Sequence, residues 1–292
     1  MKGIVLAGGS GSRLFPATLA ISKQLLPVFD KPMVYYPLSV LMLADIREIL
    51  LISTPEHLPF YRKLLGDGST WGINISYVIQ EKPIGLAHAF ILGQQFVGND
   101  NVAMILGDNV FYGHGLSAEL ASAAARKDGA TIFAYYVVEP SQYGVVKFDE
   151  TGNAVDIIEK PPKFLSNWAV TGLYFYDNAV LDIAAGLRPS SRGELEITDV
   201  NRRYLELGKL HVTKLGRGYA WLDTGTHDAL LDVAEFVRSI QHRQGLLVGS
   251  PEEVAYIKKF ITLENLRALA SKYEKTAYGN YLKQLANEPD VR

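Results

Sequence analysis

The sequence predicts a mixed α/β protein built on a doubly wound, mostly parallel β-sheet, with helices added at its C-terminal end. In the first half of the chain, short apolar runs alternate with segments of helical periodicity, the order expected of parallel strands joined by crossover helices. The apolar runs show no polar alternation, which indicates strands buried on both faces. The middle of the chain has a hairpin pattern instead, and the chain after Gly245 has a helical one.

The elements of the first half follow one another at regular intervals. Strands are expected at residues 3–7, 48–53, 75–79, 102–107 and 131–138. Helices are expected between them at residues 34–45, 56–65, 86–96 and 116–127. Because ligands of doubly wound sheets bind at the carboxyl ends of the strands, the residues directly after each strand are candidates for a functional site.

The second half begins with a predicted β-hairpin, in which residues 144–149 and 154–159 flank a turn at residues 150–153 (ETGN). Further strands are expected at residues 168–176, 210–215 and 219–222, and helices near 178–186, 195–207 and 227–242. No internal repeat or low-complexity linker divides the chain. We therefore expect one domain over residues 1–245, with parts at about 1–140 and 141–226, and a helical extension over residues 246–292.

The composition of the 292 residues excludes several classes of protein. Lys plus Arg is 29 and Asp plus Glu is 31, which gives a net charge of −2, and 48% of the residues are hydrophobic. Disordered chains combine low hydrophobicity with high net charge, so this chain is not one of them. The near-neutral charge favours neither a nucleic-acid partner nor an anionic membrane. The absence of cysteine excludes disulfides, thiolate nucleophiles, iron–sulfur clusters and cysteine-ligated zinc.

No segment has the pattern of a signal peptide or a membrane span. The apolar run at residues 4–7 is shorter than the roughly 7–15 residues of a secretory signal. The most apolar internal stretch, residues 37–52, is interrupted by Asp45, Arg47 and Glu48, whereas a membrane helix needs about 20 apolar residues. We expect a cytoplasmic protein without a membrane partner.

A glycine-rich loop, LAGGSGSRL at residues 6–14, directly follows the first predicted strand. Glycines let backbone N–H groups approach an anion, and Arg13 adds a cation suited to phosphate. The loop has neither the Gly-Lys pair of a Walker A sequence nor the third glycine of the dinucleotide fingerprint, where Leu14 stands instead. The missing glycine weakens the hypothesis of a nicotinamide-dependent dehydrogenase. Taken alone, the loop leaves a phosphate site and a plain tight turn equally open.

A second cation follows Arg13 in the run SKQLLP at residues 22–27. A single lysine such as Lys23 is usually just solvated, but the glycine loop, Arg13 and this run together resemble the opening of the sugar-1-phosphate nucleotidyltransferases. Further stretches narrow the resemblance to the glucose-1-phosphate thymidylyltransferase family: residues 106–109 (LGDN), 159–161 (EKP), 167–172 (NWAVTG), 192–199 (RGELEITD) and 220–226 (AWLDTGT). The resemblance extends from residue 1 to about residue 245 and more weakly to the end.

The resemblance implies a Rossmann-like catalytic domain with a nucleotide part (about 1–140) and a sugar part (about 141–226). The implied reaction joins dTTP and α-D-glucose 1-phosphate to give dTDP-glucose and pyrophosphate, the first step toward dTDP-deoxysugars such as dTDP-rhamnose. The attacking phosphate oxygen is already anionic, so positioning and charge neutralisation take the place of a general base. The resemblance also implies Mg²⁺ held by Asp108 and Asp223, each of which follows a predicted strand. Without the other motifs, a helix or turn cap after the strand would be the favoured interpretation of Asp108.

The resemblance further implies roles for individual side chains. Arg13 and Lys23 would neutralise the triphosphate and the leaving pyrophosphate, and Lys160 would hold the phosphate of glucose 1-phosphate. The nucleotide site would comprise Leu6, Gly8, Gly9, Gly11, Ser12, Arg13, Gln24, Gln80, Gly85 and Asp108, with the Gln80 amide reading the thymine edge. The sugar site would comprise Tyr143, Gly144, Glu159, Lys160, Val170 and Trp221. For Trp221, a place in the core remains an equal alternative.

Three further expectations follow from the resemblance. His88 stands where we would expect glutamine, on the helix after the third strand. Residues 111–115 (FYGHG) would belong to a second site for feedback inhibition by a dTDP-sugar, or would form a mobile loop. The chain would assemble as a homotetramer through its C-terminal helices, where Tyr256, Ile257, Phe260 and Ile261 are available for subunit contacts or for covering the main core.

Two alternatives to this function remain open. One is a nucleotidyltransferase that uses UTP or another sugar 1-phosphate, because thymine differs from uracil by one methyl group, worth about 1–3 kcal/mol in an apolar pocket. The other is a non-catalytic nucleotide-sugar sensor on the same fold. Such a sensor would be expected to have lost Arg13, Lys160 or one of the aspartates, all of which this chain retains.

Overall fold

Strands buried on both faces form the centre of the molecule, which we describe from a computed structural model covering residues 1–9 and 11–288. The parallel part of the sheet has the order β5–β4–β1–β6 and consists of β1 (Lys2–Leu6), β4 (Glu48–Ser53), β5 (Asn74–Ile79) and β6 (Val102–Leu106). Alternate side chains of these strands pack in opposite directions. Val5 and Leu51 belong to one buried apolar cluster, whereas Ile4 and Ile52 belong to the cluster on the other face.

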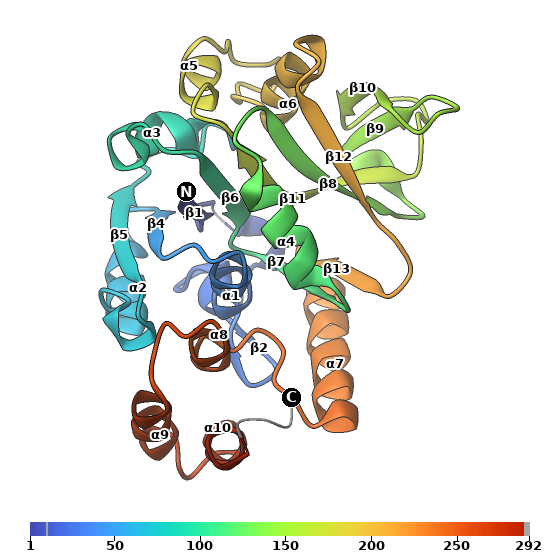
Figure 1. Cartoon of the computed structure of the whole chain (residues 1–292). Helices are drawn as coiled ribbons and strands as arrows, with labels where there is room; N and C mark the ends of the chain where they lie inside the picture. The colour runs from blue at the N-terminus through green and yellow to red at the C-terminus, as the bar shows by residue number, and fades with distance from the viewer. Residues whose placement is uncertain (10, 289–292) are drawn as a thin grey trace.

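Helices cover both faces of this sheet (Figure 1). One apolar cluster includes side chains of α1 (Tyr35–Leu43), α2 (Leu58–Leu65) and α4 (Leu116–Ala125). The other includes side chains of α3 (His88–Val97), α5 (Val180–Ala185) and α6 (Ile197–Glu206). Helix α1 is apolar on all sides because it contacts β6 and β1 on one side and α8 (Pro251–Ile257) on the other.

The second part of the sheet is mostly antiparallel. Strand β11 (Trp168–Tyr176) joins β6 and also pairs with β8 (Ala130–Tyr136) and β9 (Gly144–Phe148). The predicted hairpin is formed by β9 and β10 (Ala154–Glu159), and β12 (Leu210–Leu215) runs parallel to β8 at the other edge. The doubly wound sheet with an inserted hairpin region is therefore confirmed.

Two short ribbons lie outside this sheet. Strand β7 (Asn109–Gly113) pairs antiparallel with β13 (Tyr219–Asp223), and β2 (Pro27–Val28) pairs with β3 (Lys31–Pro32). The interpretation of residues 111–115 as a mobile loop is wrong for residues 111–113, which belong to β7. The glycine that suggested a loop, Gly113, is needed because a Cβ there would lie 2.4 Å from the Tyr219 ring.

The chain after β13 is helical. It forms α7 (His227–Gln244), α8, α9 (Leu263–Lys272) and α10 (Ala277–Asn287), and the last three lie together at the bottom of Figure 1. A Ser or Thr oxygen caps the start of each helix: Thr226, Ser250, Thr262 and Thr276. Among the described residues, four single 3₁₀ turns complete the elements: Ser12–Leu14, Lys23–Leu25, Ser69–Trp71 and Pro140–Gln142.

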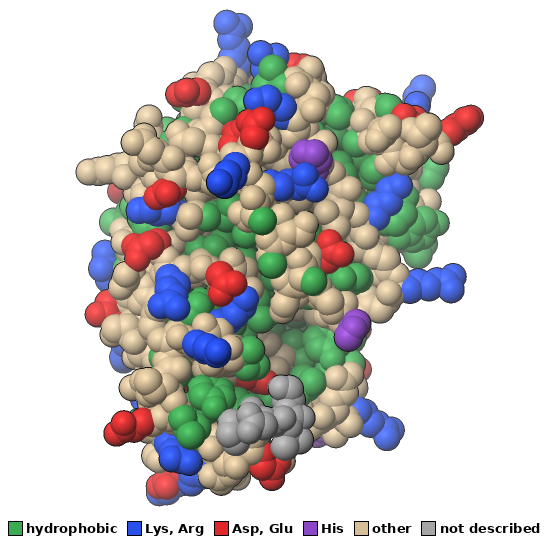
Figure 2. All heavy atoms as spheres, viewed as in Figure 1, with side chains coloured by type: hydrophobic (Ala, Val, Ile, Leu, Met, Phe, Trp, Pro, Cys, Tyr) green, Lys and Arg blue, Asp and Glu red, His purple; other side chains and the backbone are tan. Residues whose placement is uncertain are grey.

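The surface agrees with the balanced composition. On the face shown in Figure 2, acidic and basic side chains are interspersed, and neither sign dominates an area. Across residues 1–9 and 11–288, no helix combines the length and the apolar character that crossing a bilayer requires.

Candidate active site

The site begins where the direction of the sheet order reverses. Strand β1 lies between β4 and β6. The chain leaves β1 toward β4 on one side and leaves β6 toward the opposite side, so the two connections diverge between β1 and β6. Leu6 pairs with Leu106, and the Gly107 N–H donates to the Leu6 carbonyl at 2.9 Å. The glycine loop after β1 and Asp108 after β6 therefore emerge side by side at the carboxyl edge of the sheet.

The β7–β13 ribbon brings a second carboxylate to the same place. Asp223 at the end of β13 pairs with Asn109 at the start of β7, next to Asp108. The buried Thr224 hydroxyl donates to the Asp108 carbonyl at 3.0 Å and fixes the chain after the strand. Two aspartates that are 115 positions apart in the sequence thus share one site.

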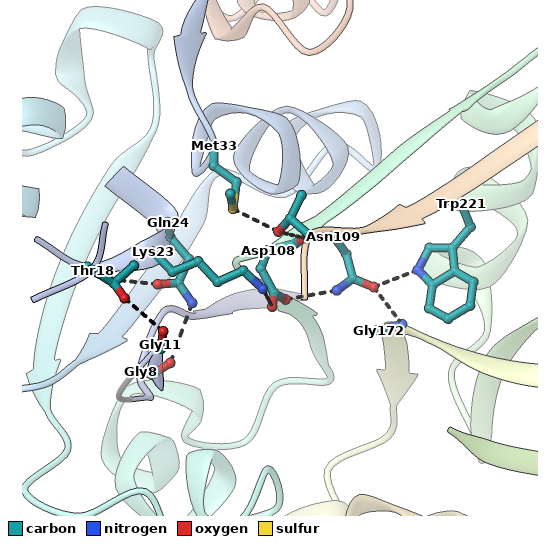
Figure 3. Close-up of polar contacts among 12 residues, drawn as sticks. Gly8, Gly11, Thr18, Lys23, Gln24, Met33, Asp108, Asn109, Gly172 and Trp221 are labelled. Carbon is teal, nitrogen blue, oxygen red and sulfur yellow. Dashed lines mark hydrogen bonds and ion pairs between the residues drawn. The ribbon is translucent and has the colours of Figure 1, made fainter. Parts of the chain in front are cut away.

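The Asp108 carboxylate is held from both sides (Figure 3). Lys23 Nζ contacts its Oδ2 at 2.6 Å, and Asn109 Nδ2 donates to its Oδ1 at 2.9 Å. The Asn109 Oδ1 in turn accepts from Trp221 Nε1 at 2.6 Å and from the Gly172 N–H at 3.2 Å. Both Asp108 oxygens therefore contact side chains, not the backbone N–H groups that a turn cap would bind.

The electrostatics of Asp223 suit a cation. Burial raises the pKa of Asp223 above its usual value, and the negative charge of Asp108 raises it further, against the opposing charges of Lys23 and Arg13. Two carboxylates whose charges act on each other are an arrangement that a divalent metal stabilises, and Mg²⁺ needs only one or two of them when phosphates supply other ligands. No group of three or more His, Asp or Glu side chains that could hold a metal ion occurs in the described part of the chain.

Three adjoining cavities surround these carboxylates, and only Asp108 borders all three within the described residues. The first, which we call the loop cavity, has a volume of about 240 Å³. It is lined by Gly8, Gly9, Gly11, Ser12, Arg13, Leu14, Lys23, Gln24, Asp108 and Gly225. Gly9 and Gly11 have φ values of 107° and 59°, which glycine adopts without strain. The Thr18 hydroxyl fixes this turn by donating to the Gly11 carbonyl at 2.8 Å.

The second cavity, the Gln80 cavity, has a volume of about 220 Å³. It is lined by Leu6, Gly8, Gly9, Gln24, Gln80, Pro83, Gly85, Leu86, Leu106, Asp108 and Glu194. Gly85 has a φ of 109°, and a Cβ there would lie 2.3 Å from the Leu195 carbonyl oxygen. Behind the cavity, the Ser22 hydroxyl donates to Gln24 Oε1 at 2.7 Å and also contacts the hydroxyl of the buried Tyr61 at 2.8 Å.

The third cavity, the hairpin cavity, has a volume of about 530 Å³ and is the largest of these three. It is lined by Arg13, Leu86, Leu106, Asp108, Asn109, Gln142, Tyr143, Gly144, Glu159, Lys160, Val170, Gly172, Tyr174, Arg192, Glu194, Glu196, Ile197, Thr198, Trp221 and Asp223. Glu159 Oε2 accepts from the Thr198 hydroxyl at 2.6 Å, and Arg192 contacts Glu159 at 3.4 Å and the buried Glu196 at 2.8 Å. Lys160 has a φ of 41°, an uncommon conformation for a side chain other than glycine.

Every site residue predicted from the sequence lines at least one of these cavities. Trp221 fits both predictions made for it, a place in the core and a place at the sugar site. Its ring packs against Tyr143 and Tyr135, and it also borders the hairpin cavity. Sequence reasoning assigned no role to Asn109, Arg192, Glu194, Glu196 and Thr198. All five lie in stretches that carry the family resemblance, and this was the signal that could have identified them. Gln142 and Leu86 had no such signal.

Known proteins resemble this chain over almost its whole length. The sequence model of the nucleotidyl transferase family matches residues 2–240. A glucose-1-phosphate thymidylyltransferase of Xanthomonas campestris pv. campestris is 58% identical over 290 residues, which cover 99% of this chain and 98% of that protein. A protein of the same name from Neisseria meningitidis serogroup A is 56% identical and covers 98% of this chain and 99% of its own length.

Solved structures agree with this relationship. A Bacillus anthracis protein described as a glucose-1-phosphate thymidylyltransferase, in complex with a sucrose, superimposes with a TM-score of 0.76 at 40% identity and covers 82% of this chain and 96% of its own. A UDP-glucose pyrophosphorylase complexed with UDP-glucose, with a TM-score of 0.71 at 23% identity and coverage of 82% and 98%, shares the fold. The resemblance inferred from the motifs is confirmed: the chain belongs to the nucleotidyl transferase family and, within it, to the glucose-1-phosphate thymidylyltransferases.

Proposed function

We propose that this enzyme transfers the thymidylyl group of dTTP to α-D-glucose 1-phosphate and releases pyrophosphate. The observation that carries the proposal is the meeting of three cavities at Asp108. The Gln80 cavity would take the thymine base, the loop cavity the triphosphate, and the hairpin cavity glucose 1-phosphate. The reacting phosphate groups of both substrates would then lie beside Asp108.

In the proposed step, a phosphate oxygen of glucose 1-phosphate forms a bond to the α-phosphorus of dTTP. The bond from that phosphorus to the oxygen leading to the β-phosphate breaks, and pyrophosphate leaves with the electron pair. The nucleophile is anionic, so the protein needs to orient it and to neutralise charge. Arg13 and Lys23 border the loop cavity and would neutralise the leaving pyrophosphate, while Lys160 borders the hairpin cavity and would hold the sugar phosphate.

We propose Mg²⁺ as the cofactor and Asp108 and Asp223 as its protein ligands. When bound, the ion would supply charge neutralisation to the nucleotide phosphates. Lys23 contacts Asp108 Oδ2 at 2.6 Å, so an ion held by this oxygen would share it with Lys23 or displace the lysine. Burial and, after it, the negative charge of Asp108 raise the pKa of Asp223, and a bound cation would offset both effects, which supports the assignment.

On the sugar side, Glu159 is placed to accept hydrogen bonds from sugar hydroxyls, because it borders the cavity and is held by Thr198. Gly144 leaves room there, since a Cβ would lie 3.0 Å from the Thr198 hydroxyl and 3.3 Å from Glu159 Oε2. Val170 and Tyr143 complete the wall with Trp221 below them.

The proposal is tested by incubating the purified protein with Mg²⁺, dTTP and glucose 1-phosphate and measuring pyrophosphate release. We expect turnover that chelation of the metal abolishes and that added Mg²⁺ restores. A panel of other nucleotides and sugar phosphates identifies the alternative substrates, UTP included. Absence of turnover with every pair, together with retained nucleotide binding, would favour the nucleotide-sugar sensor instead.

We also propose feedback inhibition by a dTDP-sugar at a second site. A separate cavity of about 260 Å³ lies between α1, β7, α8 and the connection at residues 246–250, and it includes Phe111, Gly113 and Gly115. Inhibition that excess dTTP and glucose 1-phosphate do not relieve would support this site. Inhibition that follows simple competition would place the sugar nucleotide in the active site.

Assembly as a homotetramer through the C-terminal helices, the division into residues 1–245 and 246–292, and a cytoplasmic location remain predictions. Ile257 of α8 is 54% exposed, which supports a subunit contact, whereas Phe260 and Ile261 pack partly against the main core. Light scattering of the wild type and of an Ile257→Glu variant tests the assembly.

A further inference from the structure

A histidine holds the side chain that we propose reads the base. Gln80 follows β5 and is only 2% exposed, and its amide Nε2 lies 3.2 Å from Nδ1 of His88. An amide NH₂ group donates and cannot accept, so Nδ1 of His88 accepts this hydrogen bond. His88 is therefore neutral in this arrangement, with its proton on Nε2.

The position of His88 is fixed by the backbone around it. It is the first residue of α3, and the preceding segment is bound to residue 195 in both directions. The Leu195 N–H donates to the Ile84 carbonyl at 2.7 Å, and the Ala87 N–H donates to the Leu195 carbonyl at 3.1 Å. The imidazole thus offers its acceptor from a rigid position.

The other end of the Gln80 amide points toward the glycine loop. A Cβ placed on Gly8 would lie 2.5 Å from Gln80 Oε1, so this oxygen lies directly against the Gly8 backbone. One amide hydrogen is used by His88. The second hydrogen and Oε1 form the amide edge that remains for a ligand in the Gln80 cavity.

We propose that His88 is a positioning residue for base specificity: it fixes which end of the Gln80 amide offers oxygen, so that the cavity accepts the imide edge of thymine and rejects cytosine. The imide edge presents an N3–H donor beside a carbonyl acceptor, which matches an amide oxygen beside an amide N–H. Cytosine presents the reverse order, an N3 acceptor beside an amino donor, and would require the Gln80 amide to turn over. The inference rests on the proposed function, in which this cavity takes the base.

Protonation of His88 would remove the acceptor, because both ring nitrogens of the imidazolium donate. The titratable side chains on the neighbouring elements and segments are Lys2, Glu48, Glu81, Lys82, Asp182, Arg192, Glu194 and Glu196. Arg192 pairs with Glu194 and Glu196, and none of these groups perturbs the histidine. Burial lowers the pKa of His88 below its usual value of 6.5, and the position at a helix N-terminus also disfavours the charge, so the neutral form prevails at neutral pH.

The test compares two variants that differ in the acceptor they offer. His88→Gln retains an acceptor at every pH, and His88→Leu has none. We expect His88→Leu to raise KM for dTTP roughly threefold to tenfold, the effect of one lost hydrogen bond, with little change in kcat. Its preference for dTTP over dCTP should fall by a similar factor. His88→Gln should retain both values.

A pH profile supplies a readout that a merely structural role would not change. Substrate phosphates also titrate near pH 6, so the quantity to follow is the ratio of the dTTP KM values of the wild type and His88→Gln. This ratio should be constant above pH 6.5 and rise as the pH falls below it, because only the wild type loses its acceptor. His211→Gln is the matched control, since the pKa of His211 is also lowered but this residue lies outside the three cavities.

Unchanged KM and dTTP-to-dCTP preference in His88→Leu would overturn the inference, as would parallel pH profiles of the wild type and His88→Gln. Failure of the proposed function is distinguishable. A wild type that binds dTTP but does not turn over lacks the proposed activity, and the same comparisons are then made with Kd values from calorimetry. A wild type that binds no pyrimidine nucleotide would overturn both.

Discussion

The loop cavity and the Gln80 cavity differ from the hairpin cavity in what their walls are made of. The backbone after β1 forms much of the loop cavity through Gly8, Gly9 and Gly11, and Gly8 and Gly9 also form one wall of the Gln80 cavity. The hairpin cavity is built from side chains that hold one another, such as Glu159, Arg192 and Thr198. A wall made of backbone is sensitive to an added atom where a neighbour lies against it, as at Gly8, whereas a site made of side chains depends on complete pairing. Substitutions on the two sides should therefore fail in different ways.

The largest effect is expected at Asp223, which lies beside Asp108 where the three cavities meet. Asp223→Asn should lower kcat about 100-fold or more, because it removes a carboxylate that would hold Mg²⁺ beside the reacting phosphates. The same change should raise the melting temperature of the metal-free protein at neutral pH. The folded-state pKa of Asp223 lies above 3.8, so the stability of its protonated form is lost as the pH rises through that pKa, and asparagine avoids this loss.

Calorimetric melting in EDTA and steady-state kinetics measure the two effects. The difference in stability should shrink as the pH falls through the folded-state pKa and below 3.8, where Asp223 becomes protonated in both states. Asp232→Asn on the exposed face of α7 is the control for loss of a charge. An Asp223→Asn variant that is fully active, or that is less stable than the wild type at neutral pH, would contradict the role proposed for Asp223.

The next largest effect is expected in the hairpin cavity, whose walls are made of side chains. Lys160→Ala should raise KM for glucose 1-phosphate roughly tenfold or more, the cost of a charged hydrogen bond, while KM for dTTP stays within about twofold. Initial rates with each substrate varied in turn separate the two constants. Lys163→Ala, in the same exposed connection but outside the hairpin cavity, should behave as the wild type. Equal changes in both KM values would show that the two sides are not separable.

A change in the glycine loop should instead raise KM for dTTP and leave KM for glucose 1-phosphate unchanged. Gly8→Ala places a Cβ 2.5 Å from Gln80 Oε1, and the Gln80 amide must move to admit it. We expect KM for dTTP to rise about tenfold with KM for glucose 1-phosphate unchanged. Gly216→Ala is the matched control, because nothing lies within 4 Å of a Cβ there and its φ is not positive. A Gly8→Ala enzyme with normal dTTP affinity would mean that the loop is not a rigid wall.

The smallest effect is expected for the hydrogen bond that links the two sides. Trp221→Phe removes the donor to Asn109, which orients Asp108, and should lower kcat/KM roughly threefold to tenfold without unfolding the protein. Trp71→Phe is the control, since Trp71 is buried but its Nε1 has no partner among the described residues. Equal activity of the two variants would show that Trp221 only fills space.

The sequence was most informative where the chemistry is local. The loop at residues 6–14, the strand ends before Gln80 and Asp108, and the hairpin at residues 144–159 could all be placed from short patterns, because glycine conformation and strand burial depend on neighbouring residues. The mobile-loop interpretation of residues 111–113 was wrong because a distant segment, not neighbouring residues, decides their conformation. A glycine beside aromatic residues is typical of loops, and only the partner strand β13, more than 100 positions away, makes it a strand.

What the sequence by itself determined about this protein is the sheet with its glycine loop, the absence of thiol chemistry, and a set of cations and carboxylates suited to phosphate transfer. What only the tertiary structure decided is how these groups meet. The pairing of Asp223 with Asn109, the contact of Lys23 with Asp108 and that of His88 with Gln80 join separate elements. Local preferences do not encode such distances, because they arise from the packing of whole strands and helices on one another.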